Sequence, residues 1–199
     1  EAGRMLRESH EHSPQRADIA LQLARCEIEA GRVPEARALL QELVADHPNF
    51  AAALVELSKL DLDDGQYEQA AELLSRAVTA DPSSDAAWYN LAIARERLGR
   101  ADEAAEPLAK WNELQQARLR LREQLDRIKS DPADIDARVT AGEICLAIGD
   151  AAQALRHFTA ALGQNPDHAA ALEGMNRLNN LSTAGAADPH ATQSGGIRP

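Results

Sequence analysis

Glycine, proline and alanine recur in this chain with one common period, and this repeat constrains the fold more than any other feature of the sequence. Equivalent positions in the first three units are 34 residues apart, and the fourth unit follows the third after 50 residues. The recurring glycines are Gly31, Gly65, Gly99 and Gly149. The prolines are Pro14, Pro48, Pro82, Pro132 and Pro166, and the alanines are Ala36, Ala70, Ala104 and Ala154. Three markers in one register indicate a repeat protein.

Each unit contains two apolar runs of helical length and helical spacing. The glycine after the first run permits the left-handed conformation that ends a helix, and the proline after the second run disfavours helical geometry in the residue before it. Aromatic residues make up 3% of the chain and hydrophobic residues 44%, so Ala and Leu must fill the interior. These two residues are the best helix formers, whereas strands favour β-branched and aromatic residues. The sequence therefore predicts an all-α fold of antiparallel helix hairpins.

A small residue occupies one place in the first run of every unit, namely Ala24, Ser58, Ala92 and Gly142. We expect these residues to face the recurring alanines of the second run, so that the two helices of a hairpin approach closely. A single hairpin cannot cover its own apolar face, so neighbouring hairpins must stack. The predicted architecture is a right-handed superhelical solenoid with a concave groove.

The third unit opens with the segment DAAWYNLAIARERLGRADEA. Its Trp88, Leu91, Ala92, Gly99 and Ala104 resemble the tetratricopeptide repeat (TPR) family, and the resemblance covers residues 17–168 apart from one insertion. The aromatic residue that the family carries later in the first helix is absent, and its place is taken by Glu27, Asp61, Arg95 and Cys145. We therefore expect the TPR fold with lighter packing than the family's consensus.

The register also predicts how the chain is organised. The repeats are expected at residues 17–50, 51–84, 85–134 and 135–168. Residues 1–16 are expected to be the second helix of a truncated preceding repeat, which would make the chain a fragment whose N-terminus is missing. Residues 169–181 continue the register as a capping helix. Residues 182–199 are small, polar and aperiodic, and are expected to form a flexible tail.

The third unit carries 16 extra residues, 119–134. Its second helix is predicted to run from about residue 102 to residue 129, with a kink near Pro107. An apolar stripe along this helix consists of Trp111, Leu114, Leu121, Leu125 and Ile128. In one interpretation the stripe packs against the fourth hairpin. In the other it is an association seam for a second copy or another protein.

The resemblance implies a binding site on the concave face, where TPR ligands contact the first helix of each hairpin. The residues at these places are Gln22, Arg25, Val55, Glu56, Lys59, Tyr89, Asn90, Ile93, Arg97, Thr140 and Glu143. They combine both signs of charge with an apolar floor, which suits a peptide of mixed character. The favoured function is thus a protein–protein interaction scaffold. The alternatives are a module that self-associates through residues 102–129, and a substrate-positioning domain of a larger enzyme.

Charge and motif content narrow the function further. The net charge is −11, from 21 basic and 32 acidic residues, so we expect neither nucleic acid nor an anionic membrane surface as partner. No stretch approaches the roughly 18 apolar residues that span a bilayer. Histidine and cysteine lack metal-ligand spacing, and there is no phosphate-binding loop or catalytic set, so we expect no enzyme, metal or cofactor. The excess of Arg over Lys favours a bacterial source, and the sequence does not decide between cytoplasm and periplasm.

Overall fold

The computed structural model describes residues 5–6 and 16–185, and within these ranges the chain forms only helices and turns. The predictions for most of residues 1–16 and for residues 186–199 lie outside the described residues. The helices are α2 (Ala17–Glu29), α3 (Val33–Asp46), α4 (Ala51–Asp63), α5 (Tyr67–Ala80), α6 (Asp85–Arg97), α7 (Ala101–Ser130), α8 (Ile135–Ala147), α9 (Ala151–Gln164) and α10 (Ala169–Gly185). The predicted all-α fold is confirmed.

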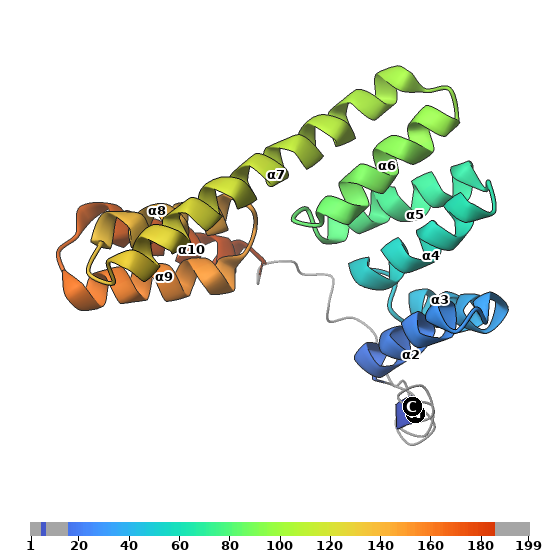
Figure 1. Ribbon diagram of the computed structural model, residues 1–199, viewed down its shortest axis with the longest axis horizontal. Helices are drawn as coiled ribbons and strands as arrows, with labels where there is room; N and C mark the ends of the chain where they lie inside the picture. The colour runs from blue at the N-terminus through green and yellow to red at the C-terminus, as the bar shows by residue number, and fades with distance from the viewer. Residues whose placement is uncertain (1–4, 7–15, 186–199) are drawn as a thin grey trace, which may run out of the picture. The chain divides into compact units, whose positions relative to one another are not determined.

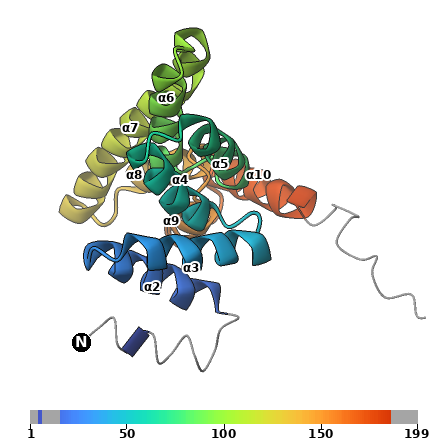
Figure 2. The ribbon, with the colours of Figure 1, turned by 90° about the vertical axis from the view of Figure 1, so that its right-hand side faces the viewer.

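The helices form two compact units, which divide inside α7 after Gln115. The first unit contains the hairpins α2–α3 and α4–α5, then α6 with the first half of α7 (Figures 1 and 2). The second unit contains the rest of α7, the hairpin α8–α9 and the single helix α10. Each unit is described by itself.

Glycine sets the point at which each hairpin turns. The four recurring glycines have φ between 74° and 84°, a conformation that side chains with a Cβ rarely adopt. At the first turn, the Gly31 N–H donates to the Ile28 carbonyl at 2.9 Å, and the Arg32 N–H donates to the Glu27 carbonyl at 2.8 Å. These bonds satisfy the carbonyls at the end of α2. The predicted role of the glycine period is therefore observed directly in the backbone.

Leucine and alanine fill the interior of the first unit. The most deeply buried large side chains there are Leu40, Leu54, Leu74 and Leu91. Helix α3 packs against α4, and α5 packs against α6. The first helices also touch one another, α2 with α4 and α4 with α6, whereas α3 and α5 make no contact along their described lengths. Because the first helices lie closer together than the second helices, α2, α4 and α6 form the inner side of this unit.

A single aromatic ring fills the interior of the second unit. Phe158 on α9 is completely buried, and it faces Gly142 on α8 and Gly174 on α10. A Cβ added at Gly142 would lie 2.7 Å from the ring, and one added at Gly174 would lie 2.3 Å from it. Real Cβ atoms do not approach so closely, so both glycines are required for the ring to fit between the two helices.

The TPR family carries an aromatic residue late in the first helix of each hairpin. The residues found at that position here have different surroundings in the two units. In the first unit, Glu27 and Asp61 are buried and form ion pairs with Arg32 and Arg37, respectively. Arg37 also pairs with the exposed Asp64 at 2.8 Å. In the second unit the place is taken by Cys145, whose burial raises the pKa of its thiol to about 11. This thiol is therefore protonated and unreactive at neutral pH.

Two helices extend beyond the repeat pattern. Helix α7 spans 30 residues, one residue longer at each end than expected, and Pro107 is buried within it. Helix α10 continues to Gly185, four residues into the segment expected to be a tail. Among the described residues, no helix combines the length and the apolar character that crossing a bilayer requires.

Candidate functional site

The inner side of the first unit presents most of the predicted groove residues. Gln22, Tyr89 and Arg97 are exposed. Those that are partly buried are Arg25, Glu56, Lys59, Asn90 and Ile93. Val55 is the exception, because it is 4% exposed and belongs to the hydrophobic core beneath this face. It supports the surface from below and is not available for contact.

Charged residues on α2 and α4 neutralise one another. The Glu56 carboxylate lies 2.9 Å from the Arg25 guanidinium and 3.1 Å from the Lys59 ammonium. The carboxylate is largely covered, while both basic side chains are more than two-fifths exposed. Exposed ion pairs of this kind contribute little to stability. The charges of these three side chains sum to one positive charge.

Helices α6 and α7 bring two aromatic side chains together on the same unit. The rings of Tyr89 and Trp111 lie 5.1 Å apart between centroids, tilted by 42°. Tyr89 is 44% exposed, whereas the aliphatic residues in the same place of the other hairpins, Leu21, Val55 and Val139, are at most 5% exposed. Sequence reasoning placed Tyr89 in the groove and Trp111 in the stripe of the long helix. Their contact depends on the alignment of α6 with α7, which no repeat marker specifies.

The neighbours of the aromatic pair hold it in position. The Gln115 side-chain amide donates to Asp85 at 3.0 Å, which ties α7 to the start of α6. The start of α6 is itself capped, since the Ser84 hydroxyl accepts from the Ala87 N–H. Asn90 and Ile93 follow Tyr89 along α6, and Leu108, which precedes Trp111 by about one turn on α7, is 37% exposed. The result is a mainly uncharged, partly apolar area on a rigid frame.

The two remaining groove residues, Thr140 and Glu143, belong to the second unit and are described apart. The Thr140 hydroxyl donates to the Asp136 carbonyl within α8 at 2.8 Å. The Glu143 carboxylate lies 3.3 Å from the Arg177 guanidinium on α10. Both polar groups therefore have partners within their own unit.

The apolar stripe of α7 is not a continuous surface seam. Leu114 and Leu121 are only 8% and 9% exposed, so they are already covered. Ile128 is partly buried and Leu125 is 40% exposed. A seam built on all five stripe residues would require uncovering two core side chains. The structure thus gives Leu114 and Leu121 a packing role.

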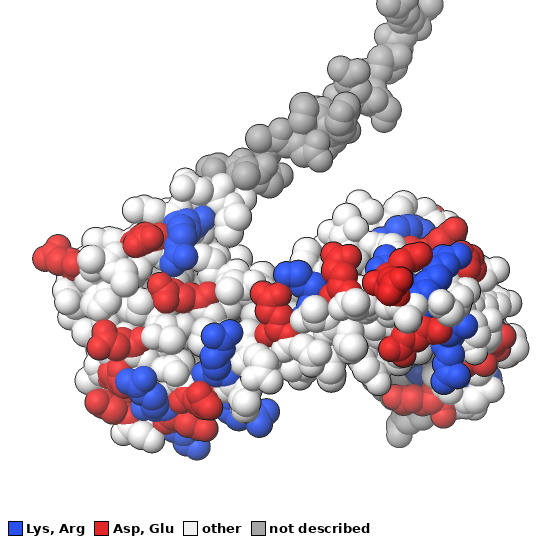
Figure 3. All heavy atoms as spheres, turned by 90° about the horizontal axis from the view of Figure 1, so that it is seen from above, with Lys and Arg blue, Asp and Glu red and all other residues white. Residues whose placement is uncertain are grey.

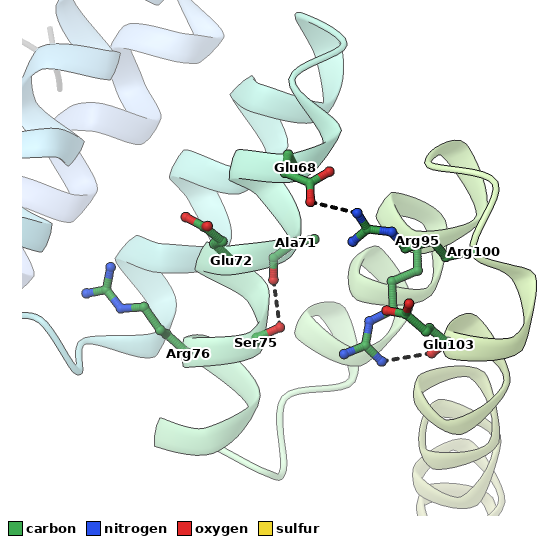
Figure 4. Close-up of a pocket in the computed structure, with 8 residues that line it drawn as sticks. All are labelled: Glu68, Ala71, Glu72, Ser75, Arg76, Arg95, Arg100 and Glu103. Atoms are coloured by element: carbon green, nitrogen blue, oxygen red, sulfur yellow. Dashed lines mark hydrogen bonds and ion pairs between the residues drawn. The ribbon is translucent and has the colours of Figure 1, made fainter.

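The structure shows one feature that sequence reasoning missed, an open hollow of about 440 Å³ beside α5. It is lined by Glu68, Ala71, Glu72, Ser75, Arg76, Arg95, Arg100 and Glu103 (Figure 4). Arg100 pairs with Glu68 at 2.9 Å, and Arg95 donates to the Glu103 carbonyl at 2.8 Å. The only signal of this hollow in the sequence was Arg95, which stands where the TPR family carries an aromatic residue late in the first helix. The Glu68–Arg100 ion pair therefore connects neighbouring hairpins across the hollow.

Acidic and basic side chains are interspersed on the visible face of each unit, without a large patch of one sign (Figure 3). Within the described part of the chain, no group of three or more His, Cys, Asp or Glu residues is arranged to hold a metal ion. The candidate site is therefore the inner face of the first unit, centred on the Tyr89–Trp111 pair.

Comparison with known families agrees with the hairpin geometry. One tetratricopeptide repeat model matches residues 1–57, and a second matches residues 55–118 and 140–174. The chain belongs to the tetratricopeptide repeat family. TPR arrays are interaction folds, so protein–protein interaction is the general class of function that this membership implies. No curated protein sequence matches the chain significantly.

Solved TPR structures resemble the chain in fold. YrrB, described as a TPR protein with an unusual peptide-binding site, has a TM-score of 0.53 at 18% identity, over 86% of this chain and 97% of YrrB. A fragment of MamA from Desulfovibrio magneticus RS-1 has a TM-score of 0.51 at 21% identity, over 84% of this chain and 86% of the fragment. A crystal structure of MamA gives 0.50 at 21% identity, over 84% and 89%. At these identities the similarity concerns the fold alone.

Proposed function

We propose that this TPR protein is a non-enzymatic scaffold whose first unit binds a segment of another protein across α4 and α6. The bound segment is anchored by the Tyr89–Trp111 pair, and Asn90 and Ile93 extend the contact along α6. The single observation that carries the proposal is a tilted aromatic pair with an exposed Tyr89, at places where the other hairpins bury aliphatic side chains.

An exposed aromatic pair is costly unless something covers it, and it is well suited to binding. Tyrosine and tryptophan are enriched among the few residues that dominate interface energies, since they bury a large area with little loss of conformational freedom. The pair is pre-organised by the Gln115–Asp85 hydrogen bond, which lowers the ordering cost of association. The peptide-binding site of YrrB is consistent with this use of the fold.

The surface also favours a certain kind of segment. The Arg25–Glu56–Lys59 cluster carries one net positive charge, and Arg97 adds another near the end of α6. The uncharged area around Tyr89 lies near the start of α6, whereas Arg97 is the last residue of that helix. We therefore expect a segment with apolar residues at its centre and an acidic residue toward one end.

Selection from a library of displayed random peptides tests the proposal. We expect selected peptides to bind the full chain at least about tenfold more tightly than Tyr89→Ala or Trp111→Ala, because each substitution removes a central contact. Gln41→Ala, an exposed change on α3, which is not one of the inner helices, is the matched control and should bind normally. Thermal unfolding of each variant shows whether it is folded. Peptides that bind all variants equally would contradict the proposal.

A second candidate function is self-association through α7, favoured by the exposure of Leu119 (51%) and Leu125 (40%). Light scattering over a wide concentration range tests it. If this interpretation holds, Leu119→Glu/Leu125→Glu should convert an oligomer into a monomer while leaving the fold intact, since neither side chain is in the core. A monomer at all concentrations for the unmodified chain would exclude it.

A further inference from the structure

Equivalent places at two junctions between hairpins of the first unit carry opposite charges. Where α3 packs against α4, the partly buried Arg37 forms an ion pair with the buried Asp61. One repeat later, where α5 packs against α6, the corresponding residues are Ala71 and Arg95. The carboxylate of the first junction is thus replaced by a guanidinium, and the arginine opposite it is replaced by a methyl group.

A second pair of equivalent places, within one hairpin, shows the same change. In the first hairpin Arg32 forms an ion pair with the Glu27 carboxylate. The corresponding residues of the third hairpin are Arg100 and Arg95, which have the same charge. Arg100 is compensated by Glu68 at 2.9 Å, whereas no carboxylate among the described residues forms an ion pair with Arg95. Both comparisons therefore identify Arg95 as a cation that has lost the counter-charge its place has elsewhere.

Arg95 lines the open hollow of about 440 Å³ beside α5 (Figure 4). Ala71 lines it from α5, and its short side chain leaves open the space that Arg37 takes at the junction before. A guanidinium has several N–H donors, and the bond that the structure gives Arg95 goes to an uncharged group, the Glu103 carbonyl, at 2.8 Å. All residues that line the hollow lie between positions 68 and 103, so the first unit forms it without the second.

We propose that this hollow is a second binding site, which takes an acidic side chain of a partner protein. The partner's carboxylate pairs with Arg95 in the way that Asp61 pairs with Arg37 one repeat earlier. A carboxylate can accept two parallel N–H bonds from a guanidinium, which makes this pairing directional. The site is distinct from the Tyr89–Trp111 pair, because Arg95 follows Tyr89 by about one and two-thirds helical turns and therefore lies on another side of α6.

The charges around the hollow favour a carboxylate over a phosphate group. The charged side chains that line it are of both signs, namely Arg76, Arg95, Arg100, Glu68, Glu72 and Glu103. A phosphorylated side chain carries a charge of about −1.5 to −2 at neutral pH, so the glutamates repel it more strongly than they repel a single carboxylate. The ligand expected here is therefore Asp or Glu, which also supply the counter-charge at the equivalent places of the other hairpins.

A library of displayed random peptides tests the proposal when selection is combined with counter-selection. The full chain retains peptides, and the variant Ala71→Arg/Arg95→Asp removes those that bind elsewhere. This variant copies the ion pair of the first junction, so it fills the hollow with a pair of its own and should fold. We expect peptides that bind the full chain alone, each with an Asp or Glu whose exchange for Asn or Gln weakens binding about tenfold. Arg95→Gln in the protein should weaken binding to the same extent.

Three further variants separate this site from general effects of charge and from the inner face. Arg156→Gln removes an exposed positive charge from α9 and should bind the selected peptides normally. Tyr89→Ala should also bind them normally, since it alters the other proposed site. Glu103→Gln removes a negative charge from the hollow and should strengthen binding severalfold. Thermal unfolding shows whether each variant is folded.

Two competing ligands identify the source of the negative charge. Propionate carries the carboxylate without a polypeptide, and it should displace a selected peptide only at concentrations about a hundredfold above those of the peptide, because one ion pair contributes little by itself. Displacement at similar concentrations would assign the hollow to a small carboxylic acid and overturn the protein ligand. Tighter binding of a phosphoserine peptide than of its Glu counterpart would overturn the carboxylate. If no peptide distinguished the full chain from Ala71→Arg/Arg95→Asp, the site itself would be overturned.

Discussion

The two units fill equivalent places of the TPR hairpin with different pairs of side chains. In α4–α5 the places are taken by Ser58 and Leu74, and in α8–α9 by Gly142 and Phe158, all of them buried. The larger ring on one helix is matched by a missing side chain on the other. Because protein interiors are close-packed, the combined volume of the pair matters more than either residue alone. A repeat register thus determines where the pair lies but leaves open how its volume is divided.

The largest expected effect comes from removing the ring itself. Phe158→Ala should lower the free energy of unfolding by about 3–5 kcal/mol, since the flanking glycines offer no side chain that could fill the cavity. Leu74→Ala in the first unit should cost about 2–5 kcal/mol. Urea denaturation gives both values, and hydrogen exchange locates them. Loss of protection in α8–α10 for Phe158→Ala, with less change in α2–α5, is the expected pattern.

The units also differ where Asp61 of the first corresponds to Cys145 of the second. Removing the basic partner by Arg37→Ala should destabilise the chain by roughly 3 kcal/mol, because it leaves the buried Asp61 carboxylate without its counter-charge. The double change Arg37→Leu/Asp61→Cys copies the neutral arrangement of the second unit and should recover most of the loss. Urea denaturation of the three proteins checks this. A double variant as unstable as Arg37→Ala would show that the ion pair itself, and not the isolated charge, is what matters.

Exchanging the packing pair tests the volume argument directly. Gly142→Ala should destabilise by about 1–3 kcal/mol, although alanine is the better helix former, because the added Cβ would lie 2.7 Å from the Phe158 ring. Combining it with Phe158→Leu recreates the Ala24 and Leu40 pair of the first hairpin. We expect the double variant to be more stable than the sum of the single changes predicts. If chemical denaturation showed that the two single changes in unfolding free energy simply add, residues 142 and 158 would not share one packing volume.

Sequence reasoning predicted the fold well because the fold rests on backbone requirements. The four glycines that adopt positive φ are the four that set the period, and α7 lies within one residue of its expected ends. The Phe158 arrangement could not be predicted in the same way, since Gly174 lies outside the repeat markers. Glycine is required at position 174 only because the Phe158 ring of α9 reaches α10 there. That requirement comes from side-chain packing, and the repeat period does not reveal it.

The candidate site was predicted in part. The register identified Tyr89 as a surface residue of α6, but it also selected Val55, which is buried by neighbouring helices. The stripe on α7 included Trp111 at a real surface and Leu121 in a core, because periodicity alone does not say which neighbour covers a helix face. The exposure of a side chain depends on which neighbouring helix covers it, and that required the three-dimensional arrangement.

The smallest expected effect concerns the N-terminal caps of the helices, which differ between the hairpins. Helices α8 and α9 begin with Asp134 and Asp150, whose carboxylates accept the N–H groups of Ala137 and Gln153, whereas α4 and α5 have no side-chain cap. These backbone hydrogen bonds lower the pKa of both aspartates. The charged carboxylates therefore stabilise the folded state above the ordinary aspartate pKa of about 3.9, and this contribution is lost as the pH falls through the lower folded-state pKa.

Asparagine caps helices about as well as aspartate but does not titrate. Asp134→Asn/Asp150→Asn should thus change stability little at pH 7, and should reduce the loss of stability as the pH falls below the ordinary aspartate pKa of about 3.9. Urea denaturation at several pH values measures this, with Asp63→Asn on the uncapped α4 as control. If the double variant lost as much stability in acid as the unmodified chain, the caps would not be the acid-sensitive groups of the second unit.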